Sequence, residues 1–426
     1  MSLARVLNKQ YLLLRPSEQE HAGLKKECTE FLLSLRKALA KTRLRTRVFV
    51  GGSFAKGTLV KKSTYDIDVF VRMKQLKESR AALEKALALV ASSRQLTLKK
   101  IHGSRDYFQL HHQEGRVIFE VIPVLDIPRP ARAENVTDLS YFHVAYVKKR
   151  LKGRMADDVR LAKQFCHAQG VYGAESYIRG FSGYGLECLI INYKTFANLL
   201  KALSRVQEPI VLDPAHHYRT AVEARLSLNE AKRQSPIVLV DPTYKERNVL
   251  AALSAESFGT FQRAAKQFLT RPSDTSFIEK PFDVHAFVRR AHQKHFEVRR
   301  IELHTDRQAG DVAGTKLKKV ASYLLERVAP YFSIREHRFD YAGEQHATLF
   351  VSYAPKGTIE RKGPLIRMKE ACAEFKRHHA KTFVKKGRLI AQVTNLKTFE
   401  QTLTELTSQH EQMYNMGLTE ARIESI

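Results

Sequence analysis

The sequence predicts a multidomain chain in which α/β and α+β parts are joined by a helix-rich segment. Strand-like runs alternate with helical periodicity up to about residue 130, residues 136–205 are helix-rich, and mixed elements return from residue 296. A chain of 426 residues has the length of two to four domains of about 150 residues. We therefore expect three domains, at residues 1–135, 136–272 and 273–426.

The first part carries the clearest patterns. Residues 17–41 have apolar side chains at helical spacing, and Ser17 followed by acidic residues is a suitable helix start. A short strand at Val48–Val50 ends at Gly51-Gly52, and a helix opens around Ser53. The other elements that we expect here are a strand at 66–71, a helix at 77–92, and strands at 107–110 and 117–122.

The later elements are less regular. Residues 206–255 read as loops and short strands, with one strand at Ile237–Val240. Beyond residue 296 the pattern predicts a small α+β domain of ferredoxin-like or related type. Its expected elements are strands at 296–303, 347–353 and 389–393 and helices at 316–328 and 369–378.

Charge is the strongest compositional feature. Lys and Arg number 72 against 44 Asp and Glu, a net charge of +28. A field of this size attracts polyanions. No segment combines a basic face with an exposed, aromatic-rich apolar face, so we favour nucleic acid over a membrane surface. Solubility, or a generally basic proteome, is the alternative explanation.

Membrane and secretory classes are not expected. The chain has no run of about 18 apolar residues, and its N-terminus lacks the apolar block of a signal peptide. None of the four cysteines stands in a C-x-x-C pair, which argues against a zinc ribbon or a disulfide scaffold. We therefore expect a reduced, cytoplasmic protein.

Paired carboxylates follow the glycine turn. Asp66 and Asp68 lie two residues apart on a predicted strand, so both project to one face. Two carboxylates this close repel each other unless cations neutralise them, and an oxygen-rich site of this kind suits Mg²⁺. The glycines at 51 and 52 let backbone N–H groups approach phosphate oxygens. The alternative is a polar edge strand with solvated carboxylates.

Glu120 is the candidate for a third carboxylate. It interrupts the otherwise apolar strand Val117–Ile122, and a buried carboxylate is costly unless it is paired or bound to metal. Three carboxylates could hold two metal ions that activate a hydroxyl and hold a leaving pyrophosphate. The alternative is a charge on a half-exposed face.

The turn Gly52-Ser53-Phe54-Ala55-Lys56-Gly57-Thr58, followed by Asp66-Ile67-Asp68-Val69-Phe70, resembles the nucleotidyltransferases of the DNA polymerase β superfamily. Other segments resemble one family within it, the archaeal-type (class I) CCA-adding tRNA nucleotidyltransferases. The likeness is strong from about residue 45 to 255 and weaker beyond. The segments that carry it include Phe142-His143, Arg160–Lys163, Gly170–Glu175, Arg179–Tyr184, Val240–Val249 and Lys362–Pro364.

This resemblance implies a polymerase β-like catalytic domain, a helix-rich central domain that completes the nucleotide pocket, and an α+β C-terminal RNA-binding region. Asp66 and Asp68 match the metal-binding pair, and Glu120 matches a third carboxylate that is usually Asp. Ser53 and Lys56, with Gly52, match the turn that holds the triphosphate, although the family often has Arg in place of Lys56.

Four further positions match residues at the incoming nucleotide. His143, Lys163 and Tyr172 match residues that contact it, and Arg247 matches an arginine that reads its base. Each also has an ordinary explanation, such as a surface lysine or a solvated turn. The resemblance supplies most of the weight for all four.

The implied activity is addition of CCA to the 3′ end of tRNA from CTP and ATP, without a template and with Mg²⁺. The family is often dimeric, which implies a homodimer. Other template-independent polymerases of the superfamily, such as a poly(A) polymerase or an oligoadenylate synthetase, stay open as alternatives. So do an enzyme that adds only CC or only A, and a non-catalytic RNA-binding protein.

A basic run in the C-terminal region fits an RNA partner. Residues 355–388 contain eleven Lys or Arg against three Glu, a composition suited to tracking phosphates of folded RNA. In the family this part grips the acceptor stem and T arm of tRNA. We therefore expect tRNA-binding residues here, and a solvated helix face is the alternative. The cations singled out are Lys376, Arg377, Lys385 and Lys386.

Overall fold

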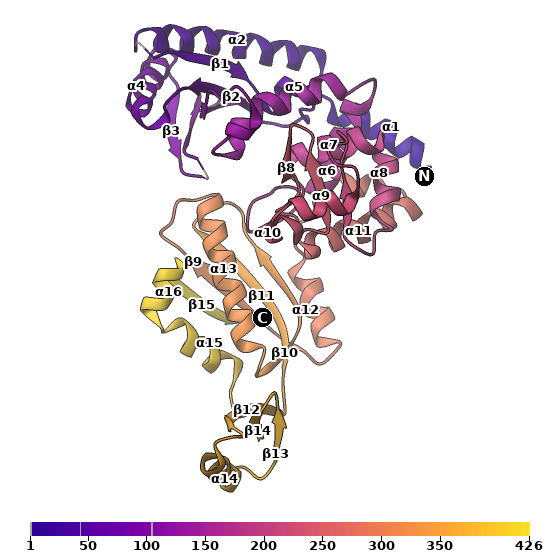
Figure 1. Ribbon diagram of the computed structural model, residues 1–426, viewed down its shortest axis with the longest axis vertical. Helices are drawn as coiled ribbons and strands as arrows, with labels where there is room; N and C mark the ends of the chain where they lie inside the picture. The colour runs from indigo at the N-terminus through magenta and orange to yellow at the C-terminus, as the bar shows by residue number, and fades with distance from the viewer. Residues whose placement is uncertain (1, 43, 104) are drawn as a thin grey trace. The chain divides into compact units, whose positions relative to one another are not determined.

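The structure, a computed structural model, describes residues 2–42, 44–103 and 105–426. It divides into two compact units, Met1–Lys280 and Pro281–Ile426, and each is described by itself (Figure 1). The division into three domains stays a prediction. No helix in the described residues is long and apolar enough to cross a membrane.

The first unit contains a five-stranded sheet in the order β1-β2-β5-β4-β3. Strands β2 and β5 pair in parallel, and the other neighbours pair antiparallel. Helices α2 and α4 cover one face, and the short helix α3 connects β1 to β2 (Figure 1). The bounds are α2 (Glu18–Ala40), β1 (Thr46–Val50), α3 (Gly52–Lys56), β2 (Tyr65–Met73), α4 (Leu76–Arg94), β3 (Thr97–Ile101), β4 (Tyr107–His111) and β5 (Val117–Leu125).

The two faces of this sheet differ in chemistry. Ile67 and Val69 of β2 are fully buried under the helices, as predicted, and the rings of Phe31 and Phe119 stack there with centroids 4.0 Å apart. Because side chains alternate along a strand, Asp66 and Asp68 lie on the opposite face. The sheet therefore separates an apolar core from a carboxylate-bearing surface.

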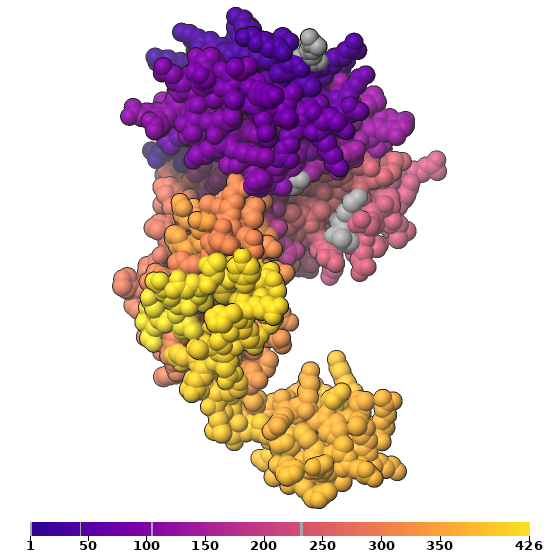
Figure 2. Space-filling view, turned by 90° about the vertical axis from the view of Figure 1, so that its left-hand side faces the viewer, coloured from indigo at the N-terminus to yellow at the C-terminus, as the bar shows by residue number. Residues whose placement is uncertain are grey.

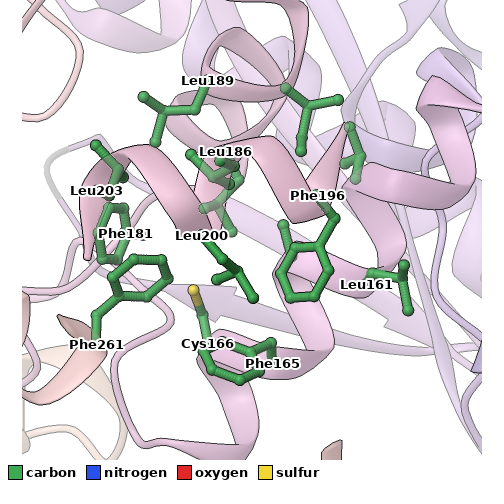
Figure 3. Packing of buried hydrophobic residues seen from close by; sticks show 14 of the residues in the cluster. Leu161, Phe165, Cys166, Phe181, Leu186, Leu189, Phe196, Leu200, Leu203 and Phe261 are labelled. Carbon is green, nitrogen blue, oxygen red and sulfur yellow. The ribbon is translucent and has the colours of Figure 1, made fainter. Parts of the chain in front are cut away.

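A second core fills the rest of the first unit. Phenylalanines from α6, α11 and the segment before α7 pack at its centre, among them Phe165, Phe181 and Phe261 (Figure 3). The N-terminal helix α1, which the sequence reading did not predict, packs Val6 and Leu14 into this core. The elements are α1 (Leu3–Leu14), η1 (Pro130–Arg132), η2 (Val136–Leu139), α5 (Ser140–Arg150), α6 (Met155–Ala168), α7 (Gly183–Tyr193), α8 (Phe196–Leu203), β6 (Ile210–Leu212), α9 (Ala221–Ser227), α10 (Glu230–Arg233), β7 (Ile237–Asp241), β8 (Tyr244–Asn248), α11 (Ala255–Thr270) and η3 (Asp274–Phe277).

The second unit is built on an antiparallel sheet in the order β10-β11-β9-β15. Its strands and helices follow the βαββαβ sequence of a ferredoxin-like fold, so that prediction is confirmed. The elements are α12 (Val284–His292), β9 (Glu297–His304), α13 (Asp311–Val328), β10 (Phe332–Asp340), β11 (His346–Pro355), α15 (Phe399–Thr407), α16 (His410–Met416) and β15 (Glu420–Ser425).

An insertion follows β11 and carries the basic run. It forms a three-stranded sheet in the order β12-β14-β13, with α14 beside it. Figures 1 and 2 show it as a lobe that stands off the ferredoxin-like sheet of the same unit. The elements are β12 (Thr358–Leu365), α14 (Lys369–His378), β13 (Thr382–Lys385) and β14 (Arg388–Thr394).

Candidate active site

The turn between β1 and α3 accepts only glycine at one position. Gly52 has φ +58°, and a Cβ built on it would lie 1.6 Å from Oδ2 of Asp68. The turn itself is held by the N–H of Gly51, which donates to the backbone carbonyl of Asp68 over 2.8 Å. The backbone of the turn therefore lies directly against the Asp68 carboxylate.

We predict that Gly52→Ala lowers the nucleotide addition expected from the sequence about 100-fold, the loss that a displacement of about 1 Å in a catalytic group produces. The new methyl group must push the Asp68 carboxylate away, and alanine is also strained at a positive φ. Single-turnover incorporation measures the loss. Gly57→Ala is the control, because Gly57 has φ +71° but open space around its Cβ position. Equal losses in both variants would contradict a specific contact with Asp68.

The three predicted carboxylates lie on one face of the sheet. Asp68 of β2 stands opposite Glu120 of β5 in the parallel register, and Asp66 stands opposite Ile118. Asp66 lies 3.6 Å from the Lys62 ammonium, while Glu120 accepts a 2.9 Å hydrogen bond from the Gln109 amide. Among the described residues, no three His, Cys, Asp or Glu side chains gather closely enough to hold a metal ion as they stand.

The electrostatics of this face favour a cation. Burial, with repulsion from Asp66, raises the pKa of Asp68 to about 6 despite the attraction of Lys56. Burial and the charge of Asp68 raise the pKa of Glu120 to about 7. A raised pKa means that the surroundings disfavour the ionised carboxylate, which an added cation would stabilise, and oxygen ligands alone suit a hard divalent cation. The residues present therefore fit such an ion.

Lys56 and Lys163 meet at a buried carboxylate that the sequence reading did not single out. Glu187 of α7 is fully buried, and its two oxygens lie 2.6 Å from Lys56 Nζ and 3.3 Å from Lys163 Nζ. The Thr58 hydroxyl donates to Glu187 over 2.6 Å and accepts from Lys163 over 3.0 Å. We call these four residues the Glu187 cluster. It brings together α3, α6 and α7 and keeps one net positive charge close to the sheet.

A second buried carboxylate organises the residues predicted to meet the base. Asp241 of β7 is fully buried; one of its oxygens lies 3.0 Å from Nε2 of His143 and 2.7 Å from the Arg247 guanidinium. The Tyr184 hydroxyl donates to its other oxygen over 3.1 Å, and the Tyr184 ring stacks on His143 at 3.8 Å. Burial alone would raise the pKa of Asp241, but the hydrogen bond from His143 and the charge of Arg247 hold it well below its usual range.

This network fixes the state of His143. Burial lowers its pKa, so the imidazole is neutral at neutral pH. Because a carboxylate only accepts hydrogen bonds, Nε2 carries the proton and Nδ1 is left as an acceptor. Arg247 also lines a cavity of about 520 Å³, within the size range of ligand pockets.

Two other predicted residues also have defined places. Ser53 lies half-buried on α3. Tyr172 stacks on His167, with ring centroids 4.3 Å apart, and its hydroxyl lies 3.0 Å from the Cβ position of Gly183. That same Cβ position lies 3.7 Å from Lys163 Cε, so Tyr172 borders the Glu187 cluster.

The predicted tRNA-binding cations are in the second unit, on the lobe. Lys376 and Arg377 are in the last turn of α14, Lys385 is the last residue of β13, and Lys386 follows it. All four are exposed. Lys385 pairs with Glu360 at 2.8 Å, which leaves the other three without a carboxylate partner among the described residues.

Comparison with known proteins finds two family models that match the first unit. Residues 157–278 match the family described as the second domain of tRNA nucleotidyltransferases, and residues 32–115 match the nucleotidyltransferase domain. A CCA-adding enzyme of Nanoarchaeum equitans is 38% identical over 244 residues, or 57% of this chain and 59% of that protein. The resemblance to the archaeal CCA-adding enzymes is confirmed. A CCA-adding enzyme of Halobacterium salinarum is 29% identical over 348 residues, which is 80% of this chain and 72% of that protein.

The match to these enzymes is partial in length. The chain spans about three-fifths of the Nanoarchaeum protein and 62% of a Thermococcus gammatolerans CCA-adding enzyme that is 30% identical. Among solved structures, a cytoplasmic RNA terminal U-transferase gives a TM-score of 0.50 at 15% identity, covering 66% of this chain and 99% of that chain. The Cid1 terminal uridylyl transferase gives a TM-score of 0.51 at 14% identity, covering 65% of this chain and 98% of that chain. These likenesses confirm the nucleotidyltransferase fold and the multidomain α/β and α+β class. Nucleotidyltransferases of this superfamily generally use a divalent metal.

Proposed function

We propose that this protein adds CCA to the 3′ end of tRNA, using CTP and ATP and no template. The observation that carries the proposal is that Lys56 and Lys163 of the Glu187 cluster are close enough to act electrostatically on Asp68 of β2. They do so within a unit that matches the nucleotidyltransferase domain and the second domain of tRNA nucleotidyltransferases. Catalysis of nucleotidyl transfer depends mostly on positioning and charge neutralisation. It therefore requires carboxylates that bind cations and lysines that bind phosphates.

Each group has a task in this reaction. Mg²⁺ held by Asp66, Asp68 and Glu120 would neutralise the triphosphate and activate the 3′-hydroxyl. The backbone at Gly52 and Ser53 binds phosphate oxygens, since no side chain intervenes at the glycine. Lys56 and Lys163 place positive charge at the polyphosphate, and Glu187 keeps both ammonium groups in position before the nucleotide arrives.

Selection of the base falls to the Asp241 network. Arg247, held by Asp241 at 2.7 Å, offers N–H donors in a fixed direction. Neutral His143 offers an acceptor at Nδ1. A site that hydrogen-bonds its substrate rejects bases that leave these groups unpaired, which is how a protein can choose C or A without a template.

One incubation tests this function. Transfer RNA that lacks its CCA end is mixed with labelled CTP and ATP and with Mg²⁺, and the products are sequenced. The expected product carries CCA. A homopolymer, or indifference to CTP, would favour the poly(A) polymerase or oligoadenylate synthetase reading. Addition of CC or of A alone would restrict the activity to part of the sequence, and no incorporation would leave the RNA-binding reading.

The lobe supplies the second prediction of this proposal. Changing Lys376, Arg377, Lys385 and Lys386 together to Gln is expected to raise the KM for tRNA about 10-fold and leave that for CTP and ATP nearly unchanged. The slope of log affinity for tRNA against log salt concentration should become flatter by about 2 to 3. Each phosphate contact contributes about 0.9 to that slope, and only three of the four cations are free to make one, since Lys385 is already paired with Glu360.

The matched control removes the same charge elsewhere. Lys25, Lys26, Lys37 and Lys85 are exposed residues of α2 and α4, and their change to Gln should leave both the KM and the slope nearly unchanged. Equal effects of the two quadruple variants would show that net charge, not the lobe, governs tRNA affinity. A cytoplasmic location and a homodimer complete the proposal.

A further inference from the structure

A cavity of about 520 Å³ in the first unit lies apart from the residues assigned to the nucleotide. It is formed at the C-terminal ends of α5 and α7 and at the turn that follows β6. None of its lining residues belongs to the Glu187 cluster, to the Asp241 network or to the cavity at Arg247. Its charged lining residues are Lys149, Arg150, Lys152, Lys194 and Asp213.

Positive charge in this cavity is not balanced. In the part of the chain that the structure describes, none of the four cations pairs with a carboxylate. Lys194 Nζ donates to the Ile191 carbonyl over 2.8 Å, and the Arg150 guanidinium lies over the Tyr146 ring at 5.9 Å. The C-termini of two helices supply about half a negative charge each, and Asp213 supplies one more. About two positive charges are left over, which two phosphodiester groups would neutralise.

The wall of the cavity also contains polar atoms that need a partner. The Tyr146 hydroxyl and Oδ1 of Asp213 are buried and have no hydrogen-bond partner within the described residues. The other Asp213 oxygen accepts from the Tyr218 N–H over 2.9 Å. Buried polar atoms nearly always have a partner, and a hydroxyl can both donate to a carboxylate and accept from a phenol. A ribose carries such hydroxyls next to its phosphates.

We propose that this cavity binds the sugar-phosphate backbone of an RNA strand, at a point outside the nucleotide pocket. The lysines serve as point charges for phosphates, and Asp213 with Tyr146 serves a ribose hydroxyl. The proposal rests on the proposed function only for the identity of the RNA, which is then the tRNA substrate. It predicts a contribution to RNA affinity that does not require catalysis.

The experiment measures RNA binding in EDTA, where no nucleotide is added. A short fluorescent single-stranded RNA is titrated with the full chain, with Lys149→Gln/Lys152→Gln/Lys194→Gln, and with the control Lys25→Gln/Lys26→Gln/Lys85→Gln. The cavity variant should bind about 10-fold more weakly at about 0.1 M salt, with a salt slope flatter by about 2, since single-stranded contacts contribute about 0.7 each. The control should change little. Equal changes in both variants, or none in either, would overturn the proposal.

A second arm identifies the source of the phosphate. The wild-type protein should prefer RNA to the same deoxyribonucleotide strand, and Asp213→Asn should narrow that preference. Inorganic phosphate or CMP should displace the RNA only poorly; displacement as strong as that by unlabelled RNA would mean a free-phosphate site and would refute the strand site. A wild-type protein that binds RNA in this way but adds no CCA would refute the proposed function alone. Addition of CCA with normal RNA affinity in the cavity variant would refute the cavity site alone.

Discussion

Alanine in place of Asp68 is expected to reduce nucleotide addition by about 1,000-fold or more, a loss of about 4 kcal/mol in transition-state stabilisation. Asp68 lies against the Gly52 backbone and opposite Glu120 in the strand register. Its loss therefore removes the carboxylate at the centre of the acidic face. Single-turnover incorporation into tRNA lacking CCA measures the effect. Glu114→Ala, which removes an exposed carboxylate from the turn between β4 and β5, should retain nearly full activity.

The same variant is expected to fold at least as well as the wild type. Burial raises the pKa of Asp68 from 3.8 to about 6, so without divalent ions the folded state holds this proton more tightly than the unfolded state. The stability from that proton is fully present below about pH 4 and is lost as pH rises through about 6. Asp68→Asn should remove this part of the pH dependence, as unfolding curves in EDTA can show. A variant that was both inactive and strongly destabilised would contradict this assignment, because misfolding would then explain the lost activity.

Local sequence patterns were enough to predict the carboxylates of β2 and the glycine turn beside them. Strand alternation places Asp66 and Asp68 on one face whatever the rest of the chain does, and the adjacent glycines indicate a close backbone approach. The pairing of Asp68 with Glu120 depends on β2 and β5 being parallel neighbours. That pairing is non-local, and the sequence alone does not contain the register.

The missed elements and residues have physical reasons of their own. Strand β3, Thr97–Ile101, is at the edge of its sheet and carries two lysines, so it shows no apolar alternation. Glu187 is separated by 131 residues from Lys56, its ion-pair partner. Its one available indication was a lone carboxylate in the apolar helix Gly183–Tyr193. Asp241 likewise pairs with His143, which lies 98 residues away in the sequence.

The Glu187 cluster gives the largest expected effect on stability. Glu187→Ala should destabilise the first unit by about 3–5 kcal/mol, the cost of removing one partner from a buried ion pair. Two lysines would then remain beside each other in a buried site, with the Thr58 hydroxyl unable to neutralise either. Glu187→Gln keeps an oxygen that can accept from the Thr58 hydroxyl, so it should also destabilise the first unit, but by less than Glu187→Ala. Chemical denaturation at neutral pH measures both.

The pH dependence of that loss separates charge from packing. Burial lowers the pKa of Lys163 from 10.5 to about 8 even with Glu187 present, so between these values the unfolded state binds more protons and stability rises with pH. Without the carboxylate, the pKa of Lys163 must fall further, and the pH range over which stability rises must extend lower. The destabilisation by Glu187→Gln should therefore shrink as pH rises toward about 8, the pKa of Lys163 in the folded wild type, and change little above it. Glu187→Gln combined with Lys163→Met should recover part of the loss at neutral pH. A loss that stayed constant with pH, and that the second change did not reduce, would mean that Glu187 contributes packing and not charge balance.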